Sequence, residues 1–142
     1  MTPGIEIERI RSFDKIGPVL ELVSETETEL VFSAADFLLW AREGISHPNA
    51  MVGLVSVGRD PAAFFVAFGP WPLDRHVFVL QAYILPEWRN TAVLQAGLDY
   101  LRHWQKETGA CGIAFQTRRP RPWMRMLKPM AKRTFYNVVM EV

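Results

Sequence analysis

Few side chains in this sequence have the chemistry of a proton-transfer group near neutral pH. The imidazole of His76 and the phenol of Tyr83 lie seven residues apart in one apolar stretch. A neutral imidazole can accept a proton as a general base. An ordinary residue at a strand end is the alternative for His76, and packing alone is the alternative for Tyr83. We take His76 and Tyr83 as the candidate catalytic residues and keep both interpretations open.

Other reactive side chains have simpler interpretations. Asp74 and Glu87 are typical of turns and surfaces. Cys111 is the only cysteine, and its apolar neighbours favour a buried thiol over a nucleophile. The three histidines lack the spacing of metal ligands, so we predict no metal site.

Arg89 is the strongest candidate for a contact to an anion. It follows Pro86 at the junction between the apolar run 76–85 and the amphipathic segment 90–109. The first amides of a helix have no partners within the helix, and with the helix dipole they favour an anion. Arg89 therefore suits a phosphate contact, and a plain surface salt bridge is the alternative.

The elements that position Arg89 are a strand and a helix. The run 76–85 is apolar and rich in β-branched and aromatic residues, which predicts a strand buried on both faces. Pro86 ends it, because proline cannot donate to a sheet ladder. Leucines at 94, 98 and 101 then recur at helical spacing. Asn90 or Thr91 is the expected N-cap, and Gly109 the expected C-terminal stop.

The rest of the chain predicts elements that pack around this unit. The expected strands are 5–10, 51–57, 62–68, 111–116 and 134–142; the expected helices are 13–23, 34–44 and a short one within 119–130. Pro18 is expected near a first helical turn, Ser33 as an N-cap, and residues 21–30 as a polar connection. The order β-α-α-β-β-β-α-β-α-β predicts an α/β fold, a mixed central sheet with helices on both faces.

Composition sets further bounds. The 142 residues predict a single domain over 1–142, and 49% hydrophobic with 22% charged residues is ordinary for a globular protein. No apolar run has the length of a membrane span, and the charged N-terminus is unlike a secretory signal, which favours a cytoplasmic protein.

The segment from Arg118 to Arg133 is strongly basic. It contains Arg118, Arg119, Arg121, Arg125, Lys128, Lys132 and Arg133, with no acidic residue. A solvated face and a site for phosphate, nucleic acid or an acidic partner are both consistent with this charge. The sequence leaves open whether the chain forms a homo-oligomer.

The turn sequence carries a family resemblance. Ile84, Pro86 and Arg89 stand in a pattern like Val-x-Pro-x-x-Arg. Together with the element order, this pattern resembles the GNAT N-acetyltransferase superfamily. The resemblance implies acetyl-CoA as cofactor and an amine as acceptor. It also implies that the pantetheine arm pairs with backbone at Ala82, Tyr83 and Ile84, and the pyrophosphate with amides at Arg89, Asn90, Thr91, Ala92, Val93 and Leu94.

The sequence also departs from the family pattern. Ala92 and Leu94 stand where the family expects glycine or alanine, and Met126 or Leu127 where many relatives have a tyrosine. The shortened ending is similar in form to small GNAT-like phage proteins. Two hypotheses follow. The first is an acetyl-CoA-dependent N-acyltransferase acting on an amine. The second is a non-catalytic GNAT-fold protein that has lost acetyl-CoA. It would serve as a phage-type structural or accessory subunit, virion-associated and joined to a protein partner through the loop 69–73 or the basic segment.

Overall fold

In a computed structural model of the chain, residues 4–30, 32–71, 75–89 and 91–115 are described. They contain a five-stranded sheet whose strands lie side by side in chain order. The strands are β1 (Ile5–Arg9), β2 (Ala50–Val57), β3 (Asp60–Phe68), β4 (His76–Ile84) and β5 (Gly112–Phe115). The first three pairings are antiparallel and the pairing of β4 with β5 is parallel, so the predicted mixed sheet is confirmed.

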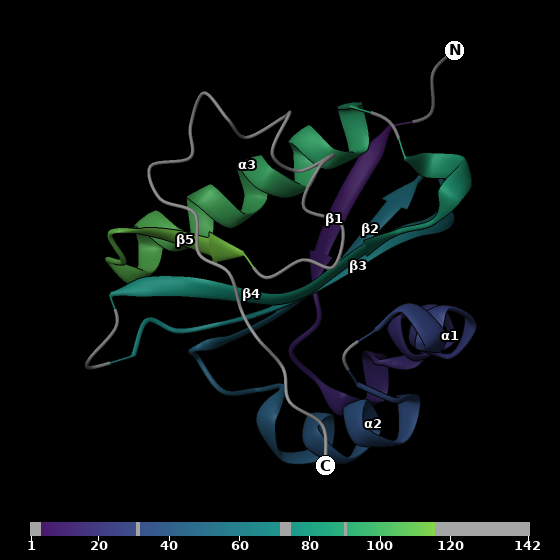
Figure 1. Cartoon of the computed structure of the whole chain (residues 1–142), viewed down its shortest axis with the longest axis horizontal. Coiled ribbons are helices and arrows are strands. Elements are labelled where there is room, and N and C mark those ends of the chain that lie inside the picture. Colours follow the sequence, from purple (N-terminus) through teal and green to yellow (C-terminus); the bar gives the residue numbers. More distant parts are fainter. Residues whose placement is uncertain (1–3, 31, 72–74, 90, 116–142) are drawn as a thin grey trace.

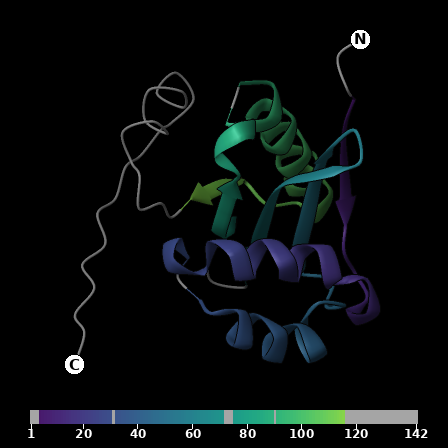
Figure 2. The same ribbon diagram turned by 90° about the vertical axis from the view of Figure 1, so that its right-hand side faces the viewer.

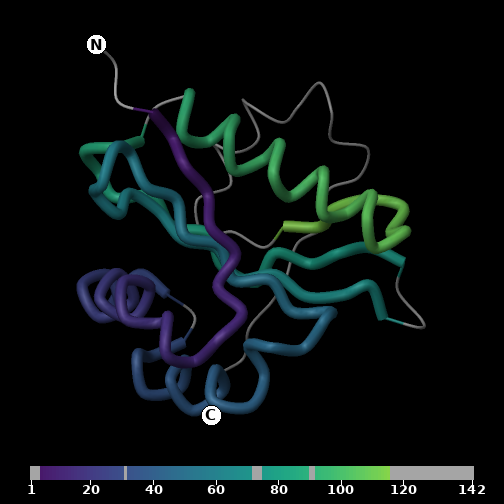
Figure 3. Tube along the Cα trace, turned by 180° about the vertical axis from the view of Figure 1, so that it is seen from behind, coloured from purple at the N-terminus to yellow at the C-terminus, as the bar shows by residue number. Residues whose placement is uncertain are grey.

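Helices lie on both faces of the sheet, as predicted (Figure 1). On one face are α1 (Gly17–Thr26) and α2 (Ala34–Gly44), and on the other is α3 (Thr91–Thr108), which connects β4 to β5 (Figure 2). Short 3-10 turns lie at Phe13–Lys15 (η1), Glu27–Glu29 (η2) and Pro86–Trp88 (η3). Seen from behind, β1 leads along the sheet down into α1 (Figure 3). The predicted helix within 119–130, the strand 134–142 and the basic segment lie outside the described residues.

Side-chain alternation divides the core into two layers. Val52 and Leu54 of β2 pack toward α1 and α2, and Met51 and Val55 of the same strand toward α3. The strands buried on both faces are therefore β2 and β3. The same prediction for β4 is wrong, because the buried residues of α1 and α2 pack on β2 and β3 and leave most of β4 half-buried.

The sequence signals for helix starts predict the structure correctly where they are strongest. The hydroxyl of Ser33 accepts from the Asp36 amide at 3.1 Å, and the Asp36 carboxylate accepts from the Ser33 amide, so the predicted N-cap is confirmed. Pro18 lies in the first turn of α1, also as predicted. The predicted connection 21–30 is wrong in its first half, because α1 continues to Thr26. The glutamates there are exposed while Leu22, Val23 and Thr26 are buried, which is an amphipathic helix rather than a loop.

The described residues contain no helix that is both long enough and apolar enough to cross a bilayer.

Two glycines facing the α3 layer have opposite surroundings. Gly53 of β2 is opposite Phe65 of β3, and the Phe65 ring lies directly over it, in contact with Tyr100 of α3 at 6.1 Å between ring centroids. A methyl group at 53 would overlap that ring. At Gly97 of α3, an added methyl group would have no atom within 4 Å.

We predict that Gly53→Ala lowers the free energy of unfolding by about 1–3 kcal/mol, because the Phe65 ring must move. The matched variant Gly97→Ala should raise it by about 0.5–1 kcal/mol, because alanine restricts the unfolded chain and favours helix. Urea unfolding of both variants measures the difference. Equal effects of the two substitutions would contradict the packing of Phe65 on Gly53.

Candidate cofactor-binding site

The C-terminal half of β4 presents different residues to the two layers. The register with β3 passes from Gln81 directly to Val79, so Leu80 forms a bulge. Beyond it, Ala82 and Ile84 pack toward α3, and Tyr83 packs toward α1 and α2. The backbone of these three residues is thus flanked by two different environments.

The turn after β4 delivers the chain into α3 within a few residues. The strand ends at Ile84, next to the proline-marked turn, as the sequence predicts. The amide of Trp88 donates to the Leu85 carbonyl at 2.9 Å and the amide of Arg89 donates to the Pro86 carbonyl at 3.3 Å. At the other end of α3, Gly109 has a φ of 76°, which confirms the predicted glycine stop.

The first turn of α3 carries the residues expected near a phosphate. Ala92 is exposed, Val93 is buried and Leu94 is half-buried. Thr91 is the first residue of α3, and Asn90 lies outside the described residues. Leu94 lines a cavity between α3 and the sheet, so its side chain turns inward rather than across the start of the helix.

This cavity, named here the α3 cavity, has a volume of about 40 Å³. Its walls include Ala82 and Ile84 of β4, Val93, Leu94 and Gly97 of α3, and Ala63 of β3. Apart from Tyr83, whose ring packs on the other layer, its described lining residues are all apolar. It adjoins the β4 backbone where the family resemblance places the pantetheine arm.

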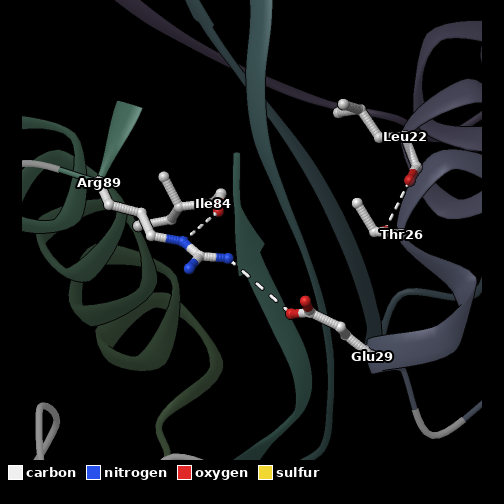
Figure 4. Close-up of polar contacts among 5 residues, drawn as sticks. All are labelled: Leu22, Thr26, Glu29, Ile84 and Arg89. Atoms are coloured by element: carbon white, nitrogen blue, oxygen red, sulfur yellow. Dashed lines mark hydrogen bonds and ion pairs between the residues drawn. The ribbon is translucent and has the colours of Figure 1, made fainter. Parts of the chain in front are cut away.

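Arg89 connects the turn to the end of β4 and to η2 on the other side of the sheet (Figure 4). Its Nε donates to the Ile84 carbonyl at 2.9 Å, and its Nη2 lies 3.9 Å from an oxygen of Glu29 in η2. Its guanidinium carbon lies 5.3 Å from the centroid of the Tyr83 ring. The structure therefore shows the surface salt bridge that the sequence left as the alternative. With side chains 36% and 42% exposed, this pair is only loosely held.

His76 lies at the opposite end of β4. Seven residues of extended chain separate it from Tyr83, which is about 23 Å at roughly 3.3 Å per residue. Its ring lies beside Gly112 and 3.8 Å from the sulfur of Cys111. The structure brings Tyr83, Ala82, Ile84 and Arg89 together and leaves His76 apart from them.

Cys111 is exposed, so the predicted burial of its thiol is wrong. The residue stands just before β5, where Ala110 occupies the buried position and the thiol points outward. Among the described residues, no group of three histidine, cysteine or acidic side chains is placed to hold a metal ion.

Sequence reasoning missed two features of this site. Glu29 contacts Arg89 from an element 60 residues earlier in the chain, and nothing local in the sequence signals that contact. Gly97 could have been singled out from the sequence, because a glycine inside a helical pattern destabilises the helix and often has a packing reason.

The fold is that of the GNAT N-acetyltransferases, as the turn sequence and element order suggested. Ribosomal-protein-alanine N-acetyltransferase from Brucella melitensis biovar Abortus 2308 superimposes with a TM-score of 0.74 at 12% identity, over 98% of this chain and 99% of that one. Aminoglycoside 6'-N-acetyltransferase AAC(6')-Ih from Acinetobacter baumannii gives 0.72 at 16% identity, over 98% and 97%.

A third structure, AAC(6')-Iy in complex with a bisubstrate analogue, CoA-S-monomethyl-acetylneamine, gives 0.73 at 12% identity, over 98% and 97%. No family model matches the sequence, and neither does any curated protein. Identities this low establish the fold alone. None of these findings supports an association with phages or virions.

The ion pair between Arg89 and Glu29 can be measured by a double-mutant cycle. We predict a coupling energy below about 1 kcal/mol from Arg89→Ala, Glu29→Gln and the double variant, because both groups are partly solvated. High salt should reduce it further. The control Glu25→Gln changes another exposed carboxylate nearby in the chain and should show no coupling with Arg89. A salt-independent coupling of several kcal/mol would contradict this view of the pair.

Proposed function

We propose that this protein is an N-acyltransferase that binds acetyl-CoA at the end of β4 and the start of α3. The observation that carries the proposal is the tight passage from β4 through Pro86–Trp88 into an 18-residue helix, in the fold of the N-acetyltransferases. Such a helix start favours a pyrophosphate. The backbone of Ala82, Tyr83 and Ile84 would hold the pantetheine arm.

The residues at the helix start fit this cofactor. The pyrophosphate would lie on amides between Arg89 and Leu94, through Asn90, Thr91, Ala92 and Val93. A backbone site of this kind requires little side-chain bulk over the amides. Ala92 is small and exposed, and Leu94 turns into the α3 cavity. Leu94 is therefore no obstacle of the kind that its sequence position suggested.

Bound acetyl-CoA would supply a thioester that an amine can attack directly. A backbone amide near Tyr83 would stabilise the negative charge that develops on the thioester oxygen. Of the two candidate catalytic residues, Tyr83 adjoins this backbone and His76 does not. We assign proton transfer to the phenol of Tyr83, with the Arg89 guanidinium above its ring.

The acceptor would approach from the α1 and α2 layer, toward which Tyr83 packs. The segment 16–41 contains no lysine or arginine, and its glutamates at 21, 25, 27 and 29 are all exposed. A negative surface attracts cationic amines and raises their local concentration. Two of the similar structures are enzymes for aminoglycosides, which agrees with a cationic amine acceptor here.

A non-catalytic role for the same fold is the second candidate. The contact of Arg89 with Glu29 and the Ile84 carbonyl favours it, because a phosphate would have to compete with those partners. A protein of this kind would bind a partner without transferring an acyl group.

Acetyl-CoA binding separates the two candidates. We predict that acetyl-CoA at about a hundred times its Kd adds roughly 2.7 kcal/mol of apparent stability. Ala92→Glu should abolish this effect, because it places bulk and negative charge beside the phosphates. Gln95→Glu adds the same charge at another exposed position of α3 and serves as the control. No stabilisation of the unaltered protein would contradict the proposed function.

Acyl transfer tests the assignment of the proton-transfer group. With a polyamine acceptor, we expect Tyr83→Phe to lower kcat about 100-fold, the lower range for a general acid or base. His76→Asn should leave kcat unchanged, because His76 lies at the far end of β4. Release of free CoA measures both rates. A large loss with His76→Asn and none with Tyr83→Phe would reverse the assignment.

A further inference from the structure

The α3 cavity exists because several of its walls are small. Gly97 stands inside a helix, where glycine costs about 1 kcal/mol relative to alanine, and a methyl group added there would contact nothing within 4 Å. Ala63 and Ala82 face it from neighbouring strands. The Phe65 ring, a large group that lines the cavity, lies over Gly53 and against Tyr100. No side chain of the described residues therefore fills the space under the first half of α3.

The size and chemistry of the α3 cavity indicate which kind of group can occupy it. A cavity needs roughly 10–15 Å³ to hold one water-sized group. A volume of about 40 Å³ thus has room for about three methylene-sized groups. Water is a poor occupant of an apolar cavity, since it needs polar partners that these walls do not supply.

The position of the α3 cavity connects it to the donor site. Ala82, Tyr83 and Ile84 form its wall at β4, where the proposed function places the end of the pantetheine arm. From there it extends under α3 past Ala63 to Val55 of β2. A chain attached to the thioester carbon and directed toward α3 would enter it.

We propose that the α3 cavity receives the acyl chain of the donor, so that the protein prefers straight acyl groups of about three or four carbons, propionyl and butyryl, over acetyl. The proposal rests on the proposed function, which it deepens by naming the donor. Gly97 is then the residue that sets the acyl length. Burial of one CH₂ is worth about a fourfold change in affinity, so butyryl-CoA should bind about 15-fold more tightly than acetyl-CoA.

The experiment compares the Kd values of CoA, acetyl-CoA, propionyl-CoA, butyryl-CoA and octanoyl-CoA by titration calorimetry on the whole chain. Affinity should rise from acetyl-CoA to butyryl-CoA and then stop rising, because the α3 cavity is full. Gly97→Val should bring butyryl-CoA to the affinity of acetyl-CoA while leaving CoA itself unchanged. The control Ala96→Val places the same side chain at the neighbouring residue of α3, which does not line the cavity. Ala82→Val narrows the cavity from β4 and should likewise lower the affinity for butyryl-CoA.

The outcomes separate the inference from the proposed function. Equal binding of acetyl-CoA and butyryl-CoA would overturn the acyl pocket and leave the N-acyltransferase standing. A loss of CoA affinity in Gly97→Val as large as the loss for butyryl-CoA would show that the α3 cavity holds pantetheine, and would also overturn the proposal. Failure of every CoA compound to bind the unaltered protein would refute both.

Discussion

The packing of α3 on the sheet is the interaction on which the candidate site depends. Val93, Leu101 and Trp104 are buried in the core layer that also contains residues of β2, β3 and β4. Each buried side chain of this kind contributes about 1.5–3 kcal/mol, whereas the partly exposed pair of Arg89 and Glu29 contributes at most about 1 kcal/mol. The burial of apolar side chains thus holds the start of α3 against the end of β4. The polar contacts of the turn contribute less to this placement.

The alternation of one strand separates the two sides of the site. Ala82 and Ile84 face the core layer under α3, and Tyr83 packs on the core layer under α1 and α2. Because successive residues of a strand point to opposite faces, three residues of β4 are enough to contact both core layers. In the proposed function, the donor and the acceptor would lie on opposite sides of this backbone.

Much of the fold could be predicted from the sequence, because its signals are local. Apolar runs marked β2 and β3, helical spacing marked α3, and Ser33, Pro86 and Gly109 marked element ends. What failed depended on distant parts of the chain. The burial of β4 depends on where α1 and α2 pack. His76 and Tyr83 stand in the same apolar run of the sequence. The length of β4 nevertheless separates His76 from the site. Facing residues such as Gly97, Ala63 and Ala82 form a cavity only after three elements have assembled.

The place of Leu94 bears on the departure of this sequence from the family pattern. Positions 94, 97 and 98 lie on one face of α3, since residues three and four apart on a helix are neighbours. A leucine at 94 consequently points at the sheet with Leu98, and does not project over the backbone amides that a phosphate would use. The fold is recognisable at 12% identity even though the turn sequence departs from the family pattern.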